Sequence, residues 1–359
     1  MFEKIFLITF ILIIFLGTIL IGNIYYPNLL SSIQRKNIEV VGRDGFGNSL
    51  LLNSLDEPKA SYIQSNGNLV FAEKTNGIWR KEIIVKNGLP GPNISLARDR
   101  NDNYYILYFT KEGSLSLATK EKNSWKVEEI FYDASLSCNL AFDNNDIPHI
   151  SFWSPQNGLL YGTKENGKWK IDIIDYGKVG WWNDLFLDKK DNPHISYFDF
   201  ERKSLLYLYF NGNYWKKETV DFGEDVGRYN SIYLERGDVP IISYFDAKEG
   251  ILKVAKKSYG GWILEKVDSE GIVGEETNIT GKDQNFIISY VGLSDNSFRI
   301  AEKVNDKWHV SIIDKKDDFT AKNIKGEIGG SNSVFLDRSG KLHLLWQDLL
   351  NDKLKYIKR

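Results

Sequence analysis

The sequence is poor in cysteine: Cys138 is the single one among 359 residues, so no disulfide can form within the chain. An exported domain of this sequence would depend on packing alone. Clustered basic charge is also missing, because 46 basic residues stand against 48 acidic ones and no run of Lys and Arg exceeds two residues. We therefore expect no nucleic-acid partner.

Several chemical signatures are absent as well. The sequence contains no zinc-ligand spacing, no calcium-binding loop, no phosphate-binding glycine loop and no Gly-x-Ser-x-Gly nucleophile motif. His149, His194 and His343 do share one position of the repeat described below, but related positions on rotated sheets are poorly placed to hold one metal ion. We expect neither a metal nor a cofactor.

An uncharged stretch near the N-terminus, residues 5–22, is eighteen residues long, close to the ~20 that cross a bilayer as a helix. Its end is a poor cleavage site, which favours an uncleaved membrane anchor; a cleaved signal peptide is the alternative. We expect residues 1–4 to be a short flank, 23–36 a linker, and 37–359 a domain outside the cytoplasm, tethered to the cell membrane or secreted after cleavage.

Six tryptophans recur at nearly constant intervals and define a repeat. They fall 46, 44, 46, 47 and 46 residues apart, at Trp79, Trp125, Trp169, Trp215, Trp262 and Trp308. Each repeat must be one supersecondary unit. The clearest copy predicts four short strands, at 183–188, 193–199, 205–210 and 215–221, because apolar and polar residues alternate there and turn residues separate the segments. First strands begin near Asn48, Ile94, Cys138, Asn183, Asn230, Thr277 and Asn332.

The two ends of the chain complete the repeat. The seventh copy stops one strand short, at Leu354–Arg359, and a spare strand, Asn37–Val41, precedes the first copy. Pairing these ends would close a ring and remove the last exposed edges. The predicted fold is all-β: a seven-bladed β-propeller of four-stranded antiparallel blades, closed by the N-terminal strand and preceded by one transmembrane helix.

The turn before the fourth strand resembles a degenerate Asp-box, or BNR-type, turn of sialidase-like propellers. It reads KTNGIW at Lys74–Trp79 and KENGKW at Lys164–Trp169, where the family motif places Ser or Thr, Asp, Gly and an aromatic residue. The resemblance covers residues 38–359 and implies the propeller fold. It does not imply sialidase activity, because the family's three arginines and its Tyr/Glu pair have no counterpart by motif.

Three connections between blades share a pattern that indicates a ligand site. Residues 177–183, 223–230 and 271–277 are predicted loops in which Val-Gly precedes two contrasting residues. The candidate ligand-binding residues are Trp181, Trp182, Arg228, Tyr229, Glu275 and Glu276. Aromatic rings stack on the apolar faces of sugars while charges fix orientation, so convergence on one rim would make a small-molecule or sugar site. The alternative is a set of ordinary solvated loop residues.

Small polar residues occupy the second position of every first strand. They are predicted to line the channel mouth, where they would hold ordered water or contact a ligand; the ring is Ser49, Ser95, Asn139, Asp184, Ser231, Asn278 and Ser333. No catalytic residue follows from a motif. The candidates for acid or base are Glu275, Glu276, Asp199 and Asp246, although an aspartate that ends a strand more often caps a turn.

The leading hypothesis is a membrane-tethered, non-catalytic binding module whose partner is a glycan or another surface polymer. One alternative is a glycosidase or polysaccharide lyase. Another is a platform for an envelope protein, which would need a broad apolar face. We expect a monomer.

Overall fold

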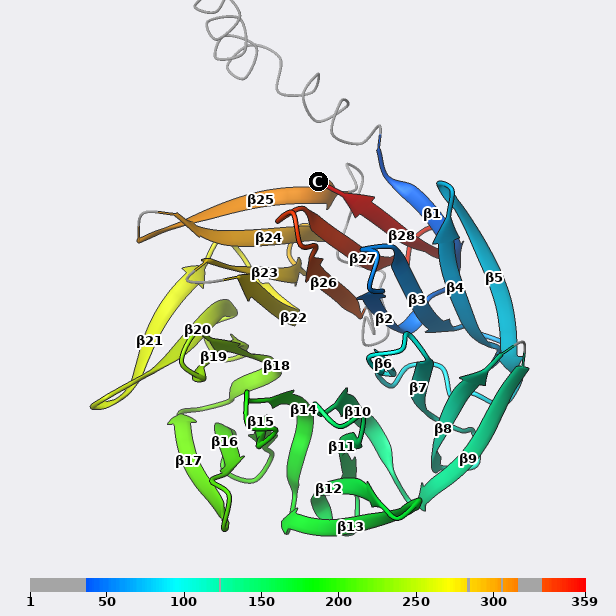
Figure 1. The fold of residues 1–359 in the computed structure, drawn as a ribbon. Helices are drawn as coiled ribbons and strands as arrows, with labels where there is room; N and C mark the ends of the chain where they lie inside the picture. The colour runs from blue at the N-terminus through cyan, green and yellow to red at the C-terminus, as the bar shows by residue number, and fades with distance from the viewer. Residues whose placement is uncertain (1–36, 123, 283–284, 305, 316–330) are drawn as a thin grey trace, which may run out of the picture. The chain divides into compact units, whose positions relative to one another are not determined.

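The computed structural model describes residues 37–359 apart from 123, 283–284, 305 and 316–330. Residues Val40–Arg359 form one compact unit built from seven four-stranded sheets (Figure 1). Hydrogen-bonded neighbours within a sheet are antiparallel. The predicted seven-bladed, all-β fold is confirmed.

The first four blades run from an inner to an outer strand. Their strands are β2 (Phe46–Leu52), β3 (Pro58–Ile63), β4 (Leu69–Thr75) and β5 (Ile78–Val85) in blade 1; β6 (Ser95–Arg98), β7 (Tyr104–Phe109), β8 (Ser114–Glu121) and β9 (Ser124–Tyr132) in blade 2; β10 (Ser135–Phe142), β11 (Pro148–Ser154), β12 (Gly158–Glu165) and β13 (Lys168–Asp175) in blade 3; and β14 (Val179–Leu187), β15 (Pro193–Asp199), β16 (Ser204–Phe210) and β17 (Trp215–Asp221) in blade 4.

The remaining blades repeat the same order, except that blade 7 takes its outer strand from the N-terminal side of the domain. The strands are β18 (Val226–Glu235), β19 (Val239–Asp246), β20 (Ile251–Ser258) and β21 (Gly261–Asp268) in blade 5; β22 (Val273–Lys282), β23 (Asn285–Gly292), β24 (Ser297–Val304) and β25 (Lys307–Lys315) in blade 6; and β26 (Asn332–Leu336), β27 (Leu342–Asp348), β28 (Lys353–Lys358) and β1 (Glu39–Arg43) in blade 7.

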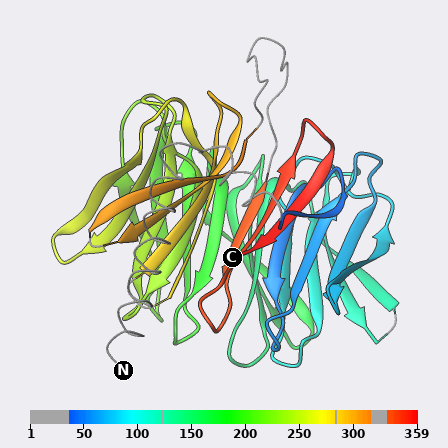
Figure 2. The ribbon, with the colours of Figure 1, turned by 90° about the horizontal axis from the view of Figure 1, so that it is seen from above.

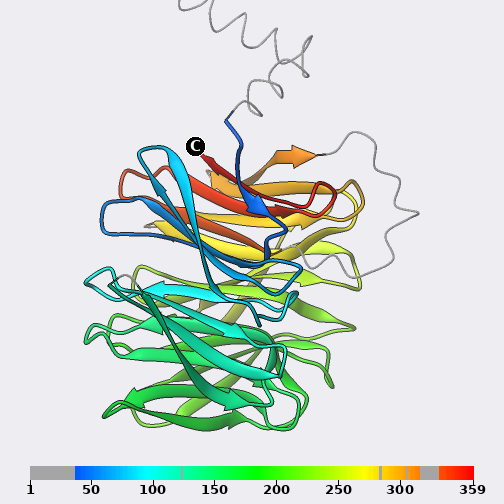
Figure 3. The ribbon, with the colours of Figure 1, turned by 90° about the vertical axis from the view of Figure 1, so that its right-hand side faces the viewer.

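Closure of the ring follows from two observations. Strand β1 is hydrogen-bonded beside β28, and Figures 1, 2 and 3 show the blue and red strands next to each other. The seven inner strands also contact one another in order, and β26 contacts β2. The N-terminal strand therefore closes the propeller as predicted, two residues later in the sequence than expected.

No helix is assigned among the described residues, and none there is long and apolar enough to span a membrane. The predicted transmembrane segment, 5–22, and the residues on either side of it lie outside the described residues.

Buried aromatic side chains at one position of the second strands join neighbouring blades. In blades 4, 5 and 6 the tyrosine hydroxyl donates to a carboxylate at the end of the preceding blade's outer strand, at 2.7 Å in each case. The pairs are Tyr197–Asp175, Tyr244–Asp221 and Tyr290–Asp268. A hydrogen bond to a charged group is stronger than one between neutral groups, so these bonds fix the angle between successive blades.

Two of the tryptophans that define the repeat also join neighbouring blades through the outer strands. Trp262 Nε1 donates to Glu218 at 3.0 Å and Trp308 Nε1 donates to Glu265 at 3.2 Å, in each case across a blade boundary. Lys303 Nζ lies 2.7 Å from Glu265 as well. In the Trp-x-x-Glu spacing of these outer strands, the tryptophan donates to the preceding blade and the glutamate accepts from the tryptophan of the next blade.

The repeated histidines are structural. His149, His194 and His343 each lie between an aspartate, 3.4–3.8 Å from Nε2, and a tyrosine hydroxyl on Nδ1. Burial lowers the pKa of all three, although the aspartates oppose it. They belong to different blades, and no group of three or more His, Cys, Asp or Glu within the described ranges could hold a metal ion.

Candidate functional site

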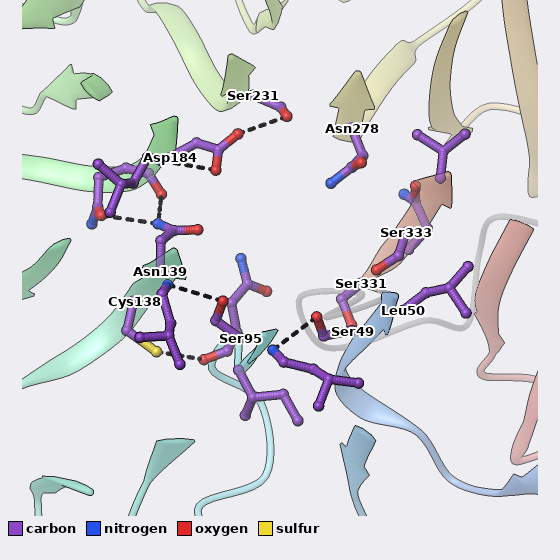
Figure 4. Close-up of a pocket in the computed structure, with 18 of the residues that line it drawn as sticks. Ser49, Leu50, Ser95, Cys138, Asn139, Asp184, Ser231, Asn278, Ser331 and Ser333 are labelled. Atoms are coloured by element: carbon purple, nitrogen blue, oxygen red, sulfur yellow. Dashed lines mark hydrogen bonds between the residues drawn. The ribbon is translucent and has the colours of Figure 1, made fainter. Parts of the chain in front are cut away.

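A cavity of about 470 Å³ lies on the propeller axis and is lined by residues of all seven inner strands or the connections just before them. The whole predicted ring of small polar residues lines it (Figure 4): Ser49, Ser95, Asn139, Asp184, Ser231, Asn278 and Ser333. The volume is within the range of about 300–1,000 Å³ that is typical of small-molecule pockets.

Most ring residues hold the blades together. Ser49 Oγ accepts a hydrogen bond from the Leu96 amide at 3.1 Å, and Ser95 Oγ accepts one from the Leu140 amide at 3.0 Å. Asp184 does the same for blade 5. A small side chain with an acceptor oxygen suits this position because it can reach the adjacent strand without filling the channel.

Asp184 is the one ring member that can carry a charge. Its Oδ2 accepts from the Ser231 hydroxyl and from the Ile232 amide, both at 2.8 Å (Figure 4), and its Oδ1 accepts from the Leu185 amide at 2.9 Å. Burial raises the pKa of Asp184 even though these bonds favour the ionised form.

The rim residues do not lie in loops, which corrects the prediction for 177–183, 223–230 and 271–277. The inner strands begin at Val179, Val226 and Val273, so the Val-Gly dipeptides and the two residues after each of them form the first residues of these strands. Each strand is interrupted by irregular register before the ring residue. The extra residues are bulges, which change the direction of the side chains that follow.

The glycine in each Val-Gly pattern allows the bulge. Gly180 has φ +102° and Gly227 has φ +108°. A β-carbon on Gly180 would lie 2.9 Å from Leu159 Cβ, and one on Gly227 would lie 2.6 Å from Leu205 Cβ. Glycine is therefore required both by the left-handed backbone and by the close approach of the third strand of the preceding blade.

The bulge separates the two residues of each predicted pair. The second member points to the channel: Trp182, Tyr229 and Glu276 all line the cavity. Their backbones are left-handed, with φ of +48°, +51° and +51°. The first members, Trp181, Arg228 and Glu275, are paired in register with the second strands and are not among the described residues that line the cavity.

Aromatic side chains are continuous from the rim of blade 4 to blade 5. Trp182 packs on Tyr229, with ring centroids 4.8 Å apart, and on Phe198 at 5.5 Å. The guanidinium of Arg228 lies 5.8 Å from the Trp182 ring and is held by Asp225 through bonds of 2.7 and 2.5 Å. Trp182 and Tyr229 are half-buried, so each combines packing with a surface open to the channel.

Glu276 is the second carboxyl group of the cavity. Burial, reinforced by the charge of Glu275, raises the pKa of Glu276 well above the ordinary value of a glutamate. A carboxyl group perturbed in this way within a cavity is characteristic of functional sites.

The two aspartates that were candidates for catalysis lie away from the cavity and cap turns. Asp199 is 2% exposed and accepts from the amides of Glu201 and Arg202 at 2.9 Å. Asp246 is 4% exposed and accepts from the Glu249 amide at 3.1 Å. Asx-type turns of this kind account for both side chains.

A layer of buried asparagines beside the ring was missed by the sequence reasoning. Asn48, Asn183, Asn230 and Asn332 line the cavity and are at most 7% exposed. Each directly precedes a ring residue. Their recurrence at one repeat position was the available signal.

No model of a known protein family matches the chain, and no curated protein matches it. Solved structures share its fold. An ulvan lyase, described as a new family of polysaccharide lyase, has a TM-score of 0.66 at 11% identity and covers 89% of this chain and 95% of its own. The SapL1 lectin in complex with α-methyl fucoside has a TM-score of 0.53 at 10% identity, with 76% and 98% covered. A variant of the Aleuria aurantia lectin has 0.52 at 11%, with 76% and 97% covered. At these identities the similarity establishes the fold.

Proposed function

We propose that this propeller is a non-catalytic glycan-binding module, tethered to the membrane outside the cytoplasm, and that its site is the channel mouth around Trp182, Tyr229 and Glu276. The two aromatic rings offer surfaces for the apolar faces of a sugar. The carboxyl group and the polar ring offer partners for its hydroxyl groups.

One observation carries the assignment. On three successive blades a large side chain occupies a left-handed backbone position at which blade 1 has Gly47, with φ +54°. A non-glycine residue costs about 1–2 kcal/mol more there. Strain of this kind persists at functional sites, and here it directs Trp182, Tyr229 and Glu276 into the cavity.

The similar folds support the proposal without deciding it. The structures described above are named as fucoside-binding lectins and a polysaccharide lyase, so this architecture serves glycan ligands elsewhere. At identities of 10–11% the ligand of this chain must come from experiment.

The test is a glycan-array screen of the full-length chain in detergent, followed by titration of the best ligand. We expect Trp182→Ala to weaken binding by about tenfold or more, the effect of losing one aromatic contact surface at a binding hot spot. Trp181→Ala is the matched control, because Trp181 belongs to the same cluster without lining the cavity. Loss of binding in the control with retention in Trp182→Ala would refute the assignment.

Glu276 supports a second candidate, a glycan hydrolase or lyase. Its raised pKa keeps the carboxyl group protonated closer to neutral pH, as a general acid requires. Each array ligand should therefore also be assayed for new reducing or unsaturated ends. Turnover that is abolished by Glu276→Gln would establish the enzyme in place of the binding module.

A further inference from the structure

We infer, on the basis of the proposed function, that the channel site accepts neutral and amine-bearing saccharides and excludes carboxylated and sulfated ones. The inference concerns the chemical class of the ligand. It rests on the charge and the hydrogen-bonding capacity of the cavity wall.

The ionisable groups of the wall are all acidic. Asp184 and Glu276 line the cavity, whereas no Lys, Arg or His in the described part of the chain does so. The guanidinium nearest the rim aromatics, Arg228, is engaged by both oxygens of Asp225. An anionic ligand would therefore lose its hydration without gaining a counter-charge from these residues, which is costly.

The wall also presents acceptors in preference to donors. Asn48, Asn183 and Asn230 donate their side-chain N–H groups to backbone carbonyls, at 2.6–3.1 Å for the main contacts. Asn139 donates to the Asn183 carbonyl at 2.6 Å, and Asn332 donates to that of Glu276. Five of the seven asparagines that line the cavity thus use their amide donors on the protein itself.

Some of the corresponding oxygens have no partner. Asn48 and Asn230 are 4% and 6% exposed, and the Oδ1 atom of each makes no hydrogen bond with any described residue. Asn48 lacks the serine donor that Asn183 has, because blade 7 has Leu345 where Ser151 of blade 3 donates to Asn183 at 2.7 Å. Buried acceptors without partners favour a ligand that brings donors.

Hydroxyl, acetamido and ammonium groups are the donors that saccharides carry. An ammonium group would gain further, because Trp182 and Tyr229 attract cations through their ring faces and Glu276 would supply the opposite charge. A bound cation would also offset the burial that raises the pKa of Glu276. Carboxylates and sulfates bring acceptors only, and among the described lining residues they meet two acidic groups and no basic one.

The experiment titrates the full-length chain with three oligosaccharides of equal length: glucosamine, N-acetylglucosamine and galacturonate oligomers. We expect the free amine to bind about tenfold more tightly than the acetylated form, the lower bound for one hydrogen bond to a charged group, and the uronate not to bind. Glu276→Gln should remove the preference for the amine, so that the free amine and the acetylated oligomer bind equally. Glu201→Gln, at an exposed residue outside the cavity lining, should change neither.

The outcomes separate the two proposals. Binding of the uronate as tight as that of the neutral oligomer would overturn the inference while glycan binding itself stands. A preference for the amine that survives Glu276→Gln would overturn it as well. Failure of every saccharide on the array to bind would instead refute the proposed function.

Discussion

Substitutions at Glu276 can separate the free-energy cost of its left-handed backbone from the contribution of its carboxyl group. Its φ is +51°. Glu276→Ala removes the carboxyl group but keeps the β-carbon, and so keeps the left-handed penalty of about 1–2 kcal/mol. Glu276→Gly removes that penalty and adds the flexibility of glycine to the unfolded chain, about 0.5–1 kcal/mol. The glycine variant should therefore be more stable than the alanine variant by about 1 kcal/mol.

The adjacent residue provides the control with the opposite sign. Glu275 is not among the described residues with positive φ, so Glu275→Gly should be less stable than Glu275→Ala by about 0.5–1 kcal/mol. The assay is urea unfolding, in which the two members of each pair are compared through their midpoints at a common slope. If alanine is the more stable substitution at both positions, the rim is not strained and the observation that carries the proposed function fails.

Two further predictions concern charges within the fold. Arg299 is 5% exposed and lies 2.8 Å from Asp268. Arg299→Met should lower the free energy of unfolding, measured in urea, by about 3–5 kcal/mol, because a buried carboxylate loses its counter-charge. Arg202→Met, at an ion pair whose Arg202 side chain is 74% exposed, should cost less than about 1 kcal/mol, and equal losses in the two variants would contradict the argument. Burial opposes ionisation of Asp188, but hydrogen bonds from Asn192 outweigh it and hold the pKa of Asp188 below its ordinary value. The stability that this lower pKa provides is present above the unfolded pKa of about 4 and is lost as the pH falls through the lower folded pKa. Asp188→Asn should therefore lower the free energy of unfolding in urea at pH 7, and the difference from the unchanged protein should vanish in acid. A difference that does not depend on pH would refute this prediction.

The fold could be predicted because every blade needs the same pattern of buried and exposed residues in its strands. The alternation of each strand, the tryptophan that opens the outer strand and the spare strand at Asn37–Val41 each reflect a local requirement. Counting them was enough to give seven blades and the closure. The observed strand, Glu39–Arg43, lies two residues later than the predicted one, at the residues that pair with β28.

The rim could be predicted only in part, because its geometry depends on a bulge. The sequence places Trp181 and Trp182 side by side, but the register irregularity after Gly180 turns only Trp182 towards the cavity. This bulge contains a left-handed residue, Trp182, and tryptophan gives no sign of that conformation in a sequence. The bonds across blade boundaries, such as Ser49 to Leu96, were equally hidden, because they join residues about one repeat apart.

The repeated and the variable residues of the propeller have different roles. The inter-blade bonds of Asp175, Asp221 and Asp268 and the acceptors of the channel ring recur on successive blades, so they set the angle between sheets and leave little freedom in the axis. The side chains of the rim follow no such rule, since tryptophan, tyrosine and glutamate occupy one repeat position on blades 4, 5 and 6. Packing between blades accounts for the contact of Trp182 with Tyr229, but it does not require three such different groups at equivalent places. A ligand that contacts each blade differently can, and that is why the rim, and not the repeated core, is where the specificity of this protein should be sought.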